Sequence, residues 1–170
     1  TTLDASARAA LFDRNTSTDD RVRERTREVI ARVRREGDAA LLAFAREFDS
    51  ATLASLEVPR SEWERALTSL EPSLRRALER AAANIRTVHE AFKPQAREVT
   101  TGDGAVIGRR PDALRRVGVY APGGRATYPS SLLMGAIPAR VAGVREVIVC
   151  TPPDASGMPS AVLLAAAAIA

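Results

Sequence analysis

The sequence has little of three residue types on which small functional sites often depend: cysteine, histidine and the aromatic residues. Its 170 residues include one cysteine and one histidine, and aromatic side chains make up 4% of the chain. A single cysteine excludes an internal disulfide framework and suggests a reducing compartment, so we expect a cytoplasmic protein. The chain is instead rich in alanine, with 32 residues. This composition favours closely packed helices over an aromatic-rich β-sandwich.

Long hydrophobic runs are also missing. No stretch of about 18 apolar residues is free of glycine, proline and charge, which excludes a membrane-spanning helix. The first eleven residues carry Asp4 and Arg8 in a polar pattern that is not typical of a secretory signal. The longest apolar run is Ala161–Ala170, which predicts a helix that is apolar on nearly every side. We expect this helix to be buried in a complete protein and exposed in a free chain of this length, with association or disorder as the result.

Basic side chains outnumber acidic ones by 25 to 21, and 24 of the 25 are arginine. Such a surplus can indicate nucleic-acid binding. Most of these arginines, however, alternate with aspartate and glutamate, as they do over residues 21–25. Alternation of this kind is typical of a solvated helix face with local ion pairs, so we expect no nucleic-acid partner.

The first half of the chain has a helical pattern. Apolar residues at helical spacing predict a helix over Thr18–Glu36, and Gly37 is expected to end it in a left-handed turn. Asp38 is predicted to cap a second helix with its own apolar stripe. Leu56–Val58 is interpreted as a short extended piece.

Two further helices follow. Ser61 and Glu64 have the spacing of a capping box and predict a helix over Glu62–Leu70. Pro72 suits the first turn of a long helix that continues to about Phe92. The side of this long helix that we expect to be buried carries Leu74, Leu78, Ala81, Ile85 and Val88.

From residue 97 onward the pattern changes. Arg97–Thr101 and Ala105–Arg109 are short extended runs joined by Gly-Asp-Gly, which predicts a β-hairpin. The order that follows is a strand over Val117–Tyr120, a glycine loop, a helix over about Pro129–Ala142 closed by Gly143, a buried strand over Glu146–Cys150, and a helix that begins near Pro159. A βαβα order of this kind implies a parallel sheet.

The predicted fold class is therefore α/β. We draw a boundary between a helical N-terminal region with a hairpin, residues 1–116, and the start of a parallel α/β domain, residues 117–170. Two strands cannot bury both faces of a doubly wound sheet. The sequence thus looks like the N-terminal part of a longer protein.

The strongest candidate for chemistry is the loop after the strand at 117–120. Tyr120, Pro122, Gly123 and Gly124 stand where the carboxyl end of a parallel strand leads toward a helix, the usual place for a ligand in α/β proteins. Glycine lets a ligand approach the backbone closely, and a tyrosine ring can pack on a planar ligand while its hydroxyl makes one hydrogen bond. No GxGxxG fingerprint is present, so a tight turn explains the glycines equally well on spacing alone.

The other residue types that carry chemistry form no set. A zinc site needs three or four ligands, and His89 has no second histidine or cysteine in helical register, so we expect no metal site and a structural or surface histidine. Cys150 is interpreted as a buried apolar side chain. Ser130 and Ser131 are expected to cap a helix. Because no nucleophile, base and orienting residue can be assembled, we expect no catalytic residue within this chain.

One segment of the sequence has a specific pattern of matching positions. These positions are Gly118, Tyr120, Pro122, Gly123, Gly124, Ala126, Tyr128, Ser131, Leu133, Met134, Pro138, Ala139, Ala142 and Gly143. On these residues the sequence resembles the histidinol dehydrogenase family. Residues 35–41, 48–49 and 83–89 resemble helices of the same family, so the likeness covers nearly the whole chain.

The resemblance implies an NAD- and zinc-dependent enzyme of histidine biosynthesis that oxidises L-histidinol through histidinaldehyde to L-histidine. It also implies a homodimer with incomplete Rossmann-like domains, similar to the aldehyde dehydrogenase architecture, with residues 117–170 as the start of an NAD-binding domain. The family tyrosine that contacts NAD falls on Tyr120; Pro122 and Gly123 are added from their loop position. The zinc ligands and the catalytic Glu-His pair are expected outside this chain, so the isolated piece is expected to be inactive. Two alternatives stay open: a related NAD-dependent dehydrogenase of another small alcohol, and a non-catalytic binding or interaction fragment.

Overall fold

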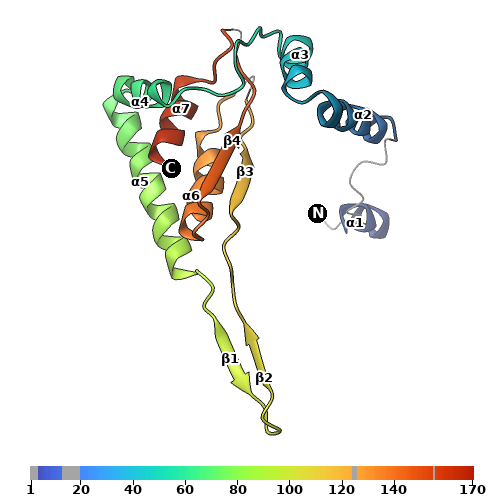
Figure 1. Cartoon of the computed structure of the whole chain (residues 1–170), viewed down its shortest axis with the longest axis vertical. Helices are drawn as coiled ribbons and strands as arrows, with labels where there is room; N and C mark the ends of the chain where they lie inside the picture. Colours follow the sequence, from blue (N-terminus) through green and yellow to red (C-terminus); the bar gives the residue numbers. More distant parts are fainter. Residues whose placement is uncertain (1–3, 13–19, 124–125, 155) are drawn as a thin grey trace. The chain divides into compact units, whose positions relative to one another are not determined.

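The computed structural model describes residues 4–12, 20–123, 126–154 and 156–170. Contacts between Cα atoms divide the chain into two compact units, Thr1–Leu41 and Leu42–Ala170. The first unit contains α1 (Ala5–Phe12), α2 (Asp20–Glu36) and the start of α3 (Asp38–Asp49), as Figure 1 shows. The boundary expected between residues 116 and 117 stays a prediction.

A single glycine separates α2 from α3. Gly37 has a φ of +60°, and its N–H donates a hydrogen bond of 2.8 Å to the carbonyl of Val33. Glycine adopts this left-handed conformation without the steric cost that a Cβ brings, so the predicted helix end is confirmed. Asp38, which we expected to cap the next helix, is instead the first residue of α3 itself.

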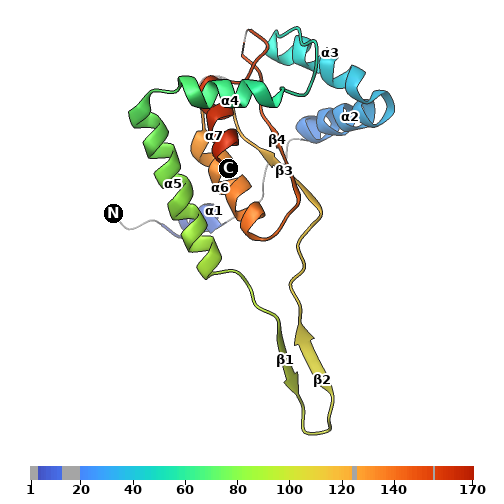
Figure 2. The ribbon, with the colours of Figure 1, turned by 60° about the vertical axis from the view of Figure 1, so that its left-hand side comes forward.

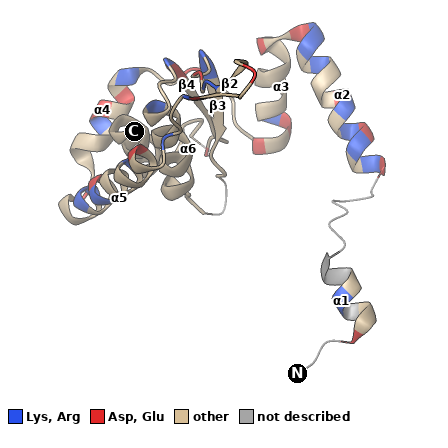
Figure 3. Ribbon diagram, turned by 90° about the horizontal axis from the view of Figure 1, so that it is seen from below, with Lys and Arg blue, Asp and Glu red and all other residues tan. Residues whose placement is uncertain are grey.

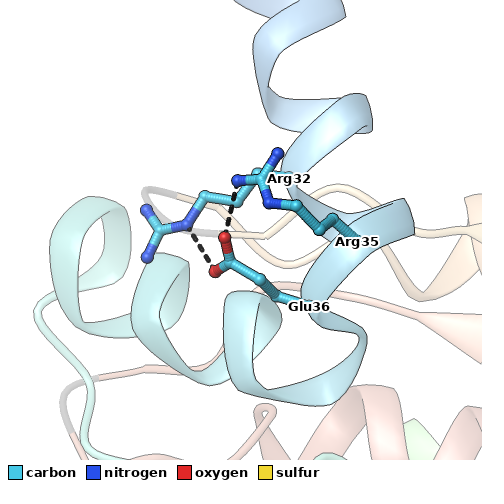
Figure 4. A network of polar contacts seen from close by, with 3 residues as sticks. All are labelled: Arg32, Arg35 and Glu36. Atoms are coloured by element: carbon cyan, nitrogen blue, oxygen red, sulfur yellow. Dashed lines mark hydrogen bonds and ion pairs between the residues drawn. The ribbon is translucent and has the colours of Figure 1, made fainter.

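Charges of both signs alternate along α2 (Figure 3), and none of its described residues is buried. Glu24 pairs with Arg27 at 3.1 Å, one helical turn away. At the end of the helix the Glu36 carboxylate accepts hydrogen bonds from Arg32 Nε at 3.0 Å and from Arg35 Nη2 at 2.6 Å (Figure 4). These are the local ion pairs on a solvated helix face that the alternating sequence pattern predicts.

The second unit contains α4 (Arg60–Ser69), α5 (Pro72–Ala91), α6 (Pro129–Val141) and α7 (Ala161–Ile169), seen from two sides in Figures 1 and 2. Its core centres on α6, where Leu132, Leu133 and Ile137 are fully buried. The α7 helix contacts α4, α5 and α6, and its Leu163 and Ala165 are buried. Our expectation that this helix is exposed in a chain of this length is therefore wrong, because α4, α5 and α6 cover it; the expected association stays a prediction.

The start of α4 and the segment before it differ from the predictions. Pro59 is the N-cap of α4 and no side chain caps the helix, so the predicted capping box of Ser61 and Glu64 is wrong. The helix begins one residue before Ser61, and Glu64 accepts a hydrogen bond of 3.2 Å from Arg60 Nε instead. The piece expected to be extended at residues 56–58 forms bends, because the Glu57 N–H bonds the Ser55 hydroxyl in a local turn.

The long helix α5 begins as predicted, with Pro72 in its first turn and the Glu71 carboxylate accepting from the Leu74 N–H at 2.9 Å. Only the middle of this helix is buried, at Leu78 and Ala82. Leu74 is 38% exposed and Val88 is 51% exposed, so the prediction that these two side chains are buried is wrong. Leu78 and Ala82 belong to the hydrophobic core around α6, and Ala81 and Ile85 pack against this core.

Two separate pairs of strands are present among the described residues. Strands β1 (Arg97–Thr100) and β2 (Val106–Arg109) form the predicted antiparallel hairpin, with Val99 opposite Ile107. Strands β3 (Arg116–Tyr120) and β4 (Glu146–Cys150) pair in parallel, as the βαβα order predicts. The connecting helix α6 ends at Val141, and Gly143 (φ +93°) closes it. The N–H groups of Gly143 and Val144 donate to the carbonyls of Arg140 and Ala139 in a Schellman motif.

The parallel pair of strands has one half-buried and one exposed face. Val147 and Val149 of β4 pack against the hydrophobic core around α6, whereas the alternate residues Ile148 and Cys150 are exposed. The prediction that Glu146–Cys150 is a buried strand is therefore wrong for Ile148 and Cys150, because the described helices cover only one face of this sheet. None of these helices is both long and apolar enough to cross a membrane.

Candidate cofactor-binding site

Tyr120 lies at the carboxyl end of β3, where the sequence predicted it. It is the last residue of the strand and stands opposite Cys150 in the parallel register. The side chain points to the open face of the sheet and is 67% exposed. Pairing continues for one more residue, because the Ala121 N–H donates to the Cys150 carbonyl at 2.9 Å. The two strands thus end side by side, and their following loops begin at the same edge.

The loop after β3 packs closely against the loop after β4. A Cβ atom placed on Gly123 would lie 3.2 Å from Pro152 Cδ, 3.3 Å from the Pro152 carbonyl oxygen and 3.3 Å from Thr151 Oγ1. Ordinary contacts are longer than this, so a larger residue at position 123 would push the two loops apart. Gly123 is therefore required by a close approach, and Pro122 beside it is half-buried. Gly124, the second glycine of the predicted loop, lies outside the described residues.

The next element to reach this edge is the N-terminus of α6. Tyr128 is its N-cap residue and is 44% exposed, and Pro129 occupies the first helical position. No side chain caps the helix, so the expectation that Ser130 and Ser131 are caps is wrong. Both serines lie inside the first turn, because the helix starts at Pro129, as predicted, and Tyr128 is therefore its N-cap. The unpaired N–H groups of a helix N-terminus favour a negatively charged ligand at such an edge.

The loop after β4 is held by its own polar groups. The Asp154 carboxylate accepts hydrogen bonds from the Ser156 N–H at 2.8 Å and from the Ser156 hydroxyl at 2.5 Å. The hydrogen bond from the Ser156 side chain, the largest cause, lowers the pKa of Asp154. Asp154 therefore stays ionised and fixes the turn, which leaves it a structural part of the loop.

The sequence interpretation missed two residues of this edge, Thr151 and Pro152. These residues belong to a Thr-Pro-Pro run, and its position after a second parallel strand is the signal that could have indicated the site. Cys150, interpreted as buried, is exposed because it lies on the uncovered face of β4. His89 is exposed on α5. Among the described residues no three of His, Cys, Asp and Glu gather in a group that could hold a metal ion.

The described residues of this edge carry groups suited to ligand contact, and among them there is no set of residues for acid–base work. It offers an exposed aromatic ring, a glycine backbone, two prolines and a helix N-terminus at one sheet edge. Such a surface fits a ligand with a planar apolar part and a polar or anionic part. The fold defines an α/β protein with a parallel βαβα unit, and the carboxyl ends of its strands form the edge where ligands usually bind in this class.

Comparison with known proteins identifies the family. The sequence model of histidinol dehydrogenase matches residues 12–170. A histidinol dehydrogenase of Natronomonas pharaonis is 53% identical over 165 residues, which is 96% of this chain and 38% of that protein. One of Bordetella parapertussis is 49% identical over 146 residues, or 84% of this chain and 33% of that protein. The crystal structure of histidinol dehydrogenase from Elizabethkingia anophelis superposes with a TM-score of 0.86 at 29% identity, and covers 99% of this chain and 39% of that one.

The chain belongs to the histidinol dehydrogenase family. It spans 33–39% of the length of these three relatives.

Proposed function

We propose that this chain is the N-terminal part of a histidinol dehydrogenase, which oxidises L-histidinol through histidinaldehyde to L-histidine with NAD. The family match over residues 12–170 supports the reaction. The observation that carries the role of this chain is the exposed Tyr120 beside the close contact of Gly123 with Thr151 and Pro152. In this proposal the chain supplies part of the cofactor surface and none of the catalytic groups.

NAD, when bound, accepts the hydride that leaves the alcohol carbon; the residues of this chain bind and orient it. The ring of Tyr120 packs against a flat part of the cofactor, and its hydroxyl donates one hydrogen bond to a polar edge. Gly123 has no side chain, so the cofactor can lie directly against the loop backbone. Pro122 limits the backbone freedom of that loop and keeps the surface in place.

The family also uses zinc, and the described residues of this chain do not fit that ion. Zinc requires three or four protein ligands, and no group of three candidate ligands is found in the described part of the chain. The proposal assigns the zinc ligands and the catalytic acid–base pair to the portion of the family that this chain does not span.

The remaining parts of the proposal concern assembly and location. We infer a homodimer of incomplete Rossmann-like domains, with residues 117–170 as the start of the NAD-binding domain, in the cytoplasm. The parallel β3–α6–β4–α7 order supports the domain assignment. The single cysteine of the chain supports a reducing compartment.

The test is a spectrophotometric assay of the full-length protein, which is the product of the whole reading frame that contains this chain. Addition of L-histidinol and NAD should produce NADH absorbance, and a chelator should abolish it. The 170-residue chain alone should produce none. A full-length protein that oxidises a different small alcohol and leaves L-histidinol untouched would overturn the substrate, whereas the absence of any NAD reduction would overturn the whole proposal.

A further inference from the structure

The hydroxyl of Thr151 stands out from every other buried polar group in the described part of the chain. Its Oγ1 atom is buried and has no hydrogen-bond partner, and it is the only buried side-chain nitrogen or oxygen there of which this is true. Burying a hydroxyl without a partner costs free energy, because the bond that it made with water is not replaced. A threonine kept at such a cost requires a physical explanation.

The position of Thr151 supplies one. It follows the last residue of β4, and its Oγ1 lies 3.3 Å from the place where a Cβ of Gly123 would stand. The hydroxyl therefore faces the backbone of the loop after β3 across the seam between the two loops. Gly123 can rotate its flanking peptide groups more freely than any other residue. Rotation of these peptide groups is therefore the change that would bring a backbone hydrogen-bonding group to Oγ1.

We propose that Thr151 is a positioning residue for the cofactor loop: its hydroxyl, unpaired without ligand, hydrogen-bonds the Gly123 backbone when NAD settles against that loop. This inference rests on the proposed function, because it takes NAD as the ligand of this edge. A hydrogen bond that exists only when the ligand is bound stabilises the bound state relative to the ligand-free state, and this whole stabilisation strengthens binding. The unpaired hydroxyl thus destabilises the ligand-free loop and strengthens cofactor binding.

The proposal predicts opposite signs for stability and for binding in one variant. Thr151→Val keeps the shape of the side chain and removes the hydroxyl. In the 170-residue chain it should raise the melting temperature by about 2–4 °C, since the cost of the unpaired group disappears. In the full-length protein it should weaken NAD binding about fivefold, with the KM for NAD raised and kcat little changed. Thr151→Ser keeps the hydroxyl and should bind NAD nearly as the unaltered protein does.

The outcomes separate this inference from the proposed function. A lower melting temperature for Thr151→Val would show that the hydroxyl has a partner in the ligand-free chain, and would overturn the inference. Unchanged NAD affinity of Thr151→Val, in a protein whose NAD affinity is reduced by Tyr120→Ala, would overturn the inference and leave the cofactor site in place. If the unaltered full-length protein binds no NAD, the proposed function fails and the inference fails with it.

Discussion

Gly135 of α6 lies directly against Val119 of β3. A Cβ atom on Gly135 would come within 2.6 Å of Val119 Cγ1 and 3.3 Å of Val119 Cγ2. Real side chains do not approach so closely, so the helix and the strand can meet at this distance only because position 135 has no side chain. This contact sets how closely the crossover helix sits on the sheet, and with it where the N-terminus of α6 lies relative to the loop of Gly123.

We expect Gly135→Ala to destabilise the chain, although alanine is normally the better helix former. Alanine gains about 1 kcal/mol of helix propensity over glycine, but forcing a methyl group into a filled contact costs about 1–3 kcal/mol. Thermal or urea unfolding of the 170-residue chain measures the difference. Gly118→Ala is the matched control, since a Cβ there meets nothing within 4 Å and should change stability little.

A double variant makes the same contact testable from the other side. Val119→Ala removes the methyl groups that a side chain at 135 would strike, so Gly135→Ala should cost less in that background. The two changes should therefore be non-additive, with a coupling of about 0.5–3 kcal/mol. Additive effects would show that the helix does not meet the strand at this point.

Tyr120 is expected to contribute to NAD binding in the full-length protein. Tyr120→Phe removes one hydrogen bond and should cost about 0.5–1.5 kcal/mol of NAD binding. Tyr120→Ala also removes the ring contact and should cost more, with little effect on histidinol binding. Calorimetric titration with NAD measures both. A large fall in the melting temperature of Tyr120→Ala, with the NAD affinity of the folded fraction unchanged, would show that Tyr120 serves packing and that its assignment to the cofactor is wrong.

The 170-residue chain should not retain zinc at one ion per chain after dialysis. The physical reason is the number of ligands, because a tightly held zinc ion needs three or four and the sequence offers one histidine and one cysteine. Elemental analysis of the dialysed protein is the measurement. Stoichiometric zinc in that sample would contradict the expectation and would give His89 or Cys150 a role in binding it.

Glu36 should titrate below the ordinary value for a glutamate, 4.5. The hydrogen bond from Arg32 is the largest cause of the lowered pKa, and the hydrogen bond from Arg35 is the second. Because the folded pKa lies below the unfolded one, the contribution of Glu36 to stability is present above about pH 4.5 and is lost as the pH falls through the folded value.

Carbon-detected NMR titration of the Glu36 carboxyl group in the 170-residue chain measures its pKa and tests whether Arg32 lowers it more than Arg35 does. Arg32→Gln should raise the pKa of Glu36 by more than Arg35→Gln does, since the larger hydrogen-bond contribution is lost. An equal pKa in the three proteins would mean that neither arginine holds the carboxylate in solution.

The sequence by itself determined most of the elements and their order. Helix periodicity, Gly37, Pro72 and Gly143 predicted where helices begin or end, because these signals act between neighbours in the chain. The order of strand, helix and strand predicted the parallel pair β3–β4, and Tyr120 was predicted at the strand end where it is found. These features follow from local geometry and from chain topology, which a sequence records directly.

Tertiary structure alone decided which faces are covered and which distant residues meet. Cys150 is exposed, contrary to the buried-strand pattern around it, and Leu163, Leu164, Ala165 and Ala166 of α7 are buried within this chain, where we expected exposure. In both cases burial depends on which elements lie against a face. The contacts of Gly135 with Val119 and of Gly123 with Thr151 join residues 16 and 28 positions apart, and no local signal records such pairs. A glycine in a sequence shows that a Cβ is absent, but only the packed structure shows which atoms occupy the space.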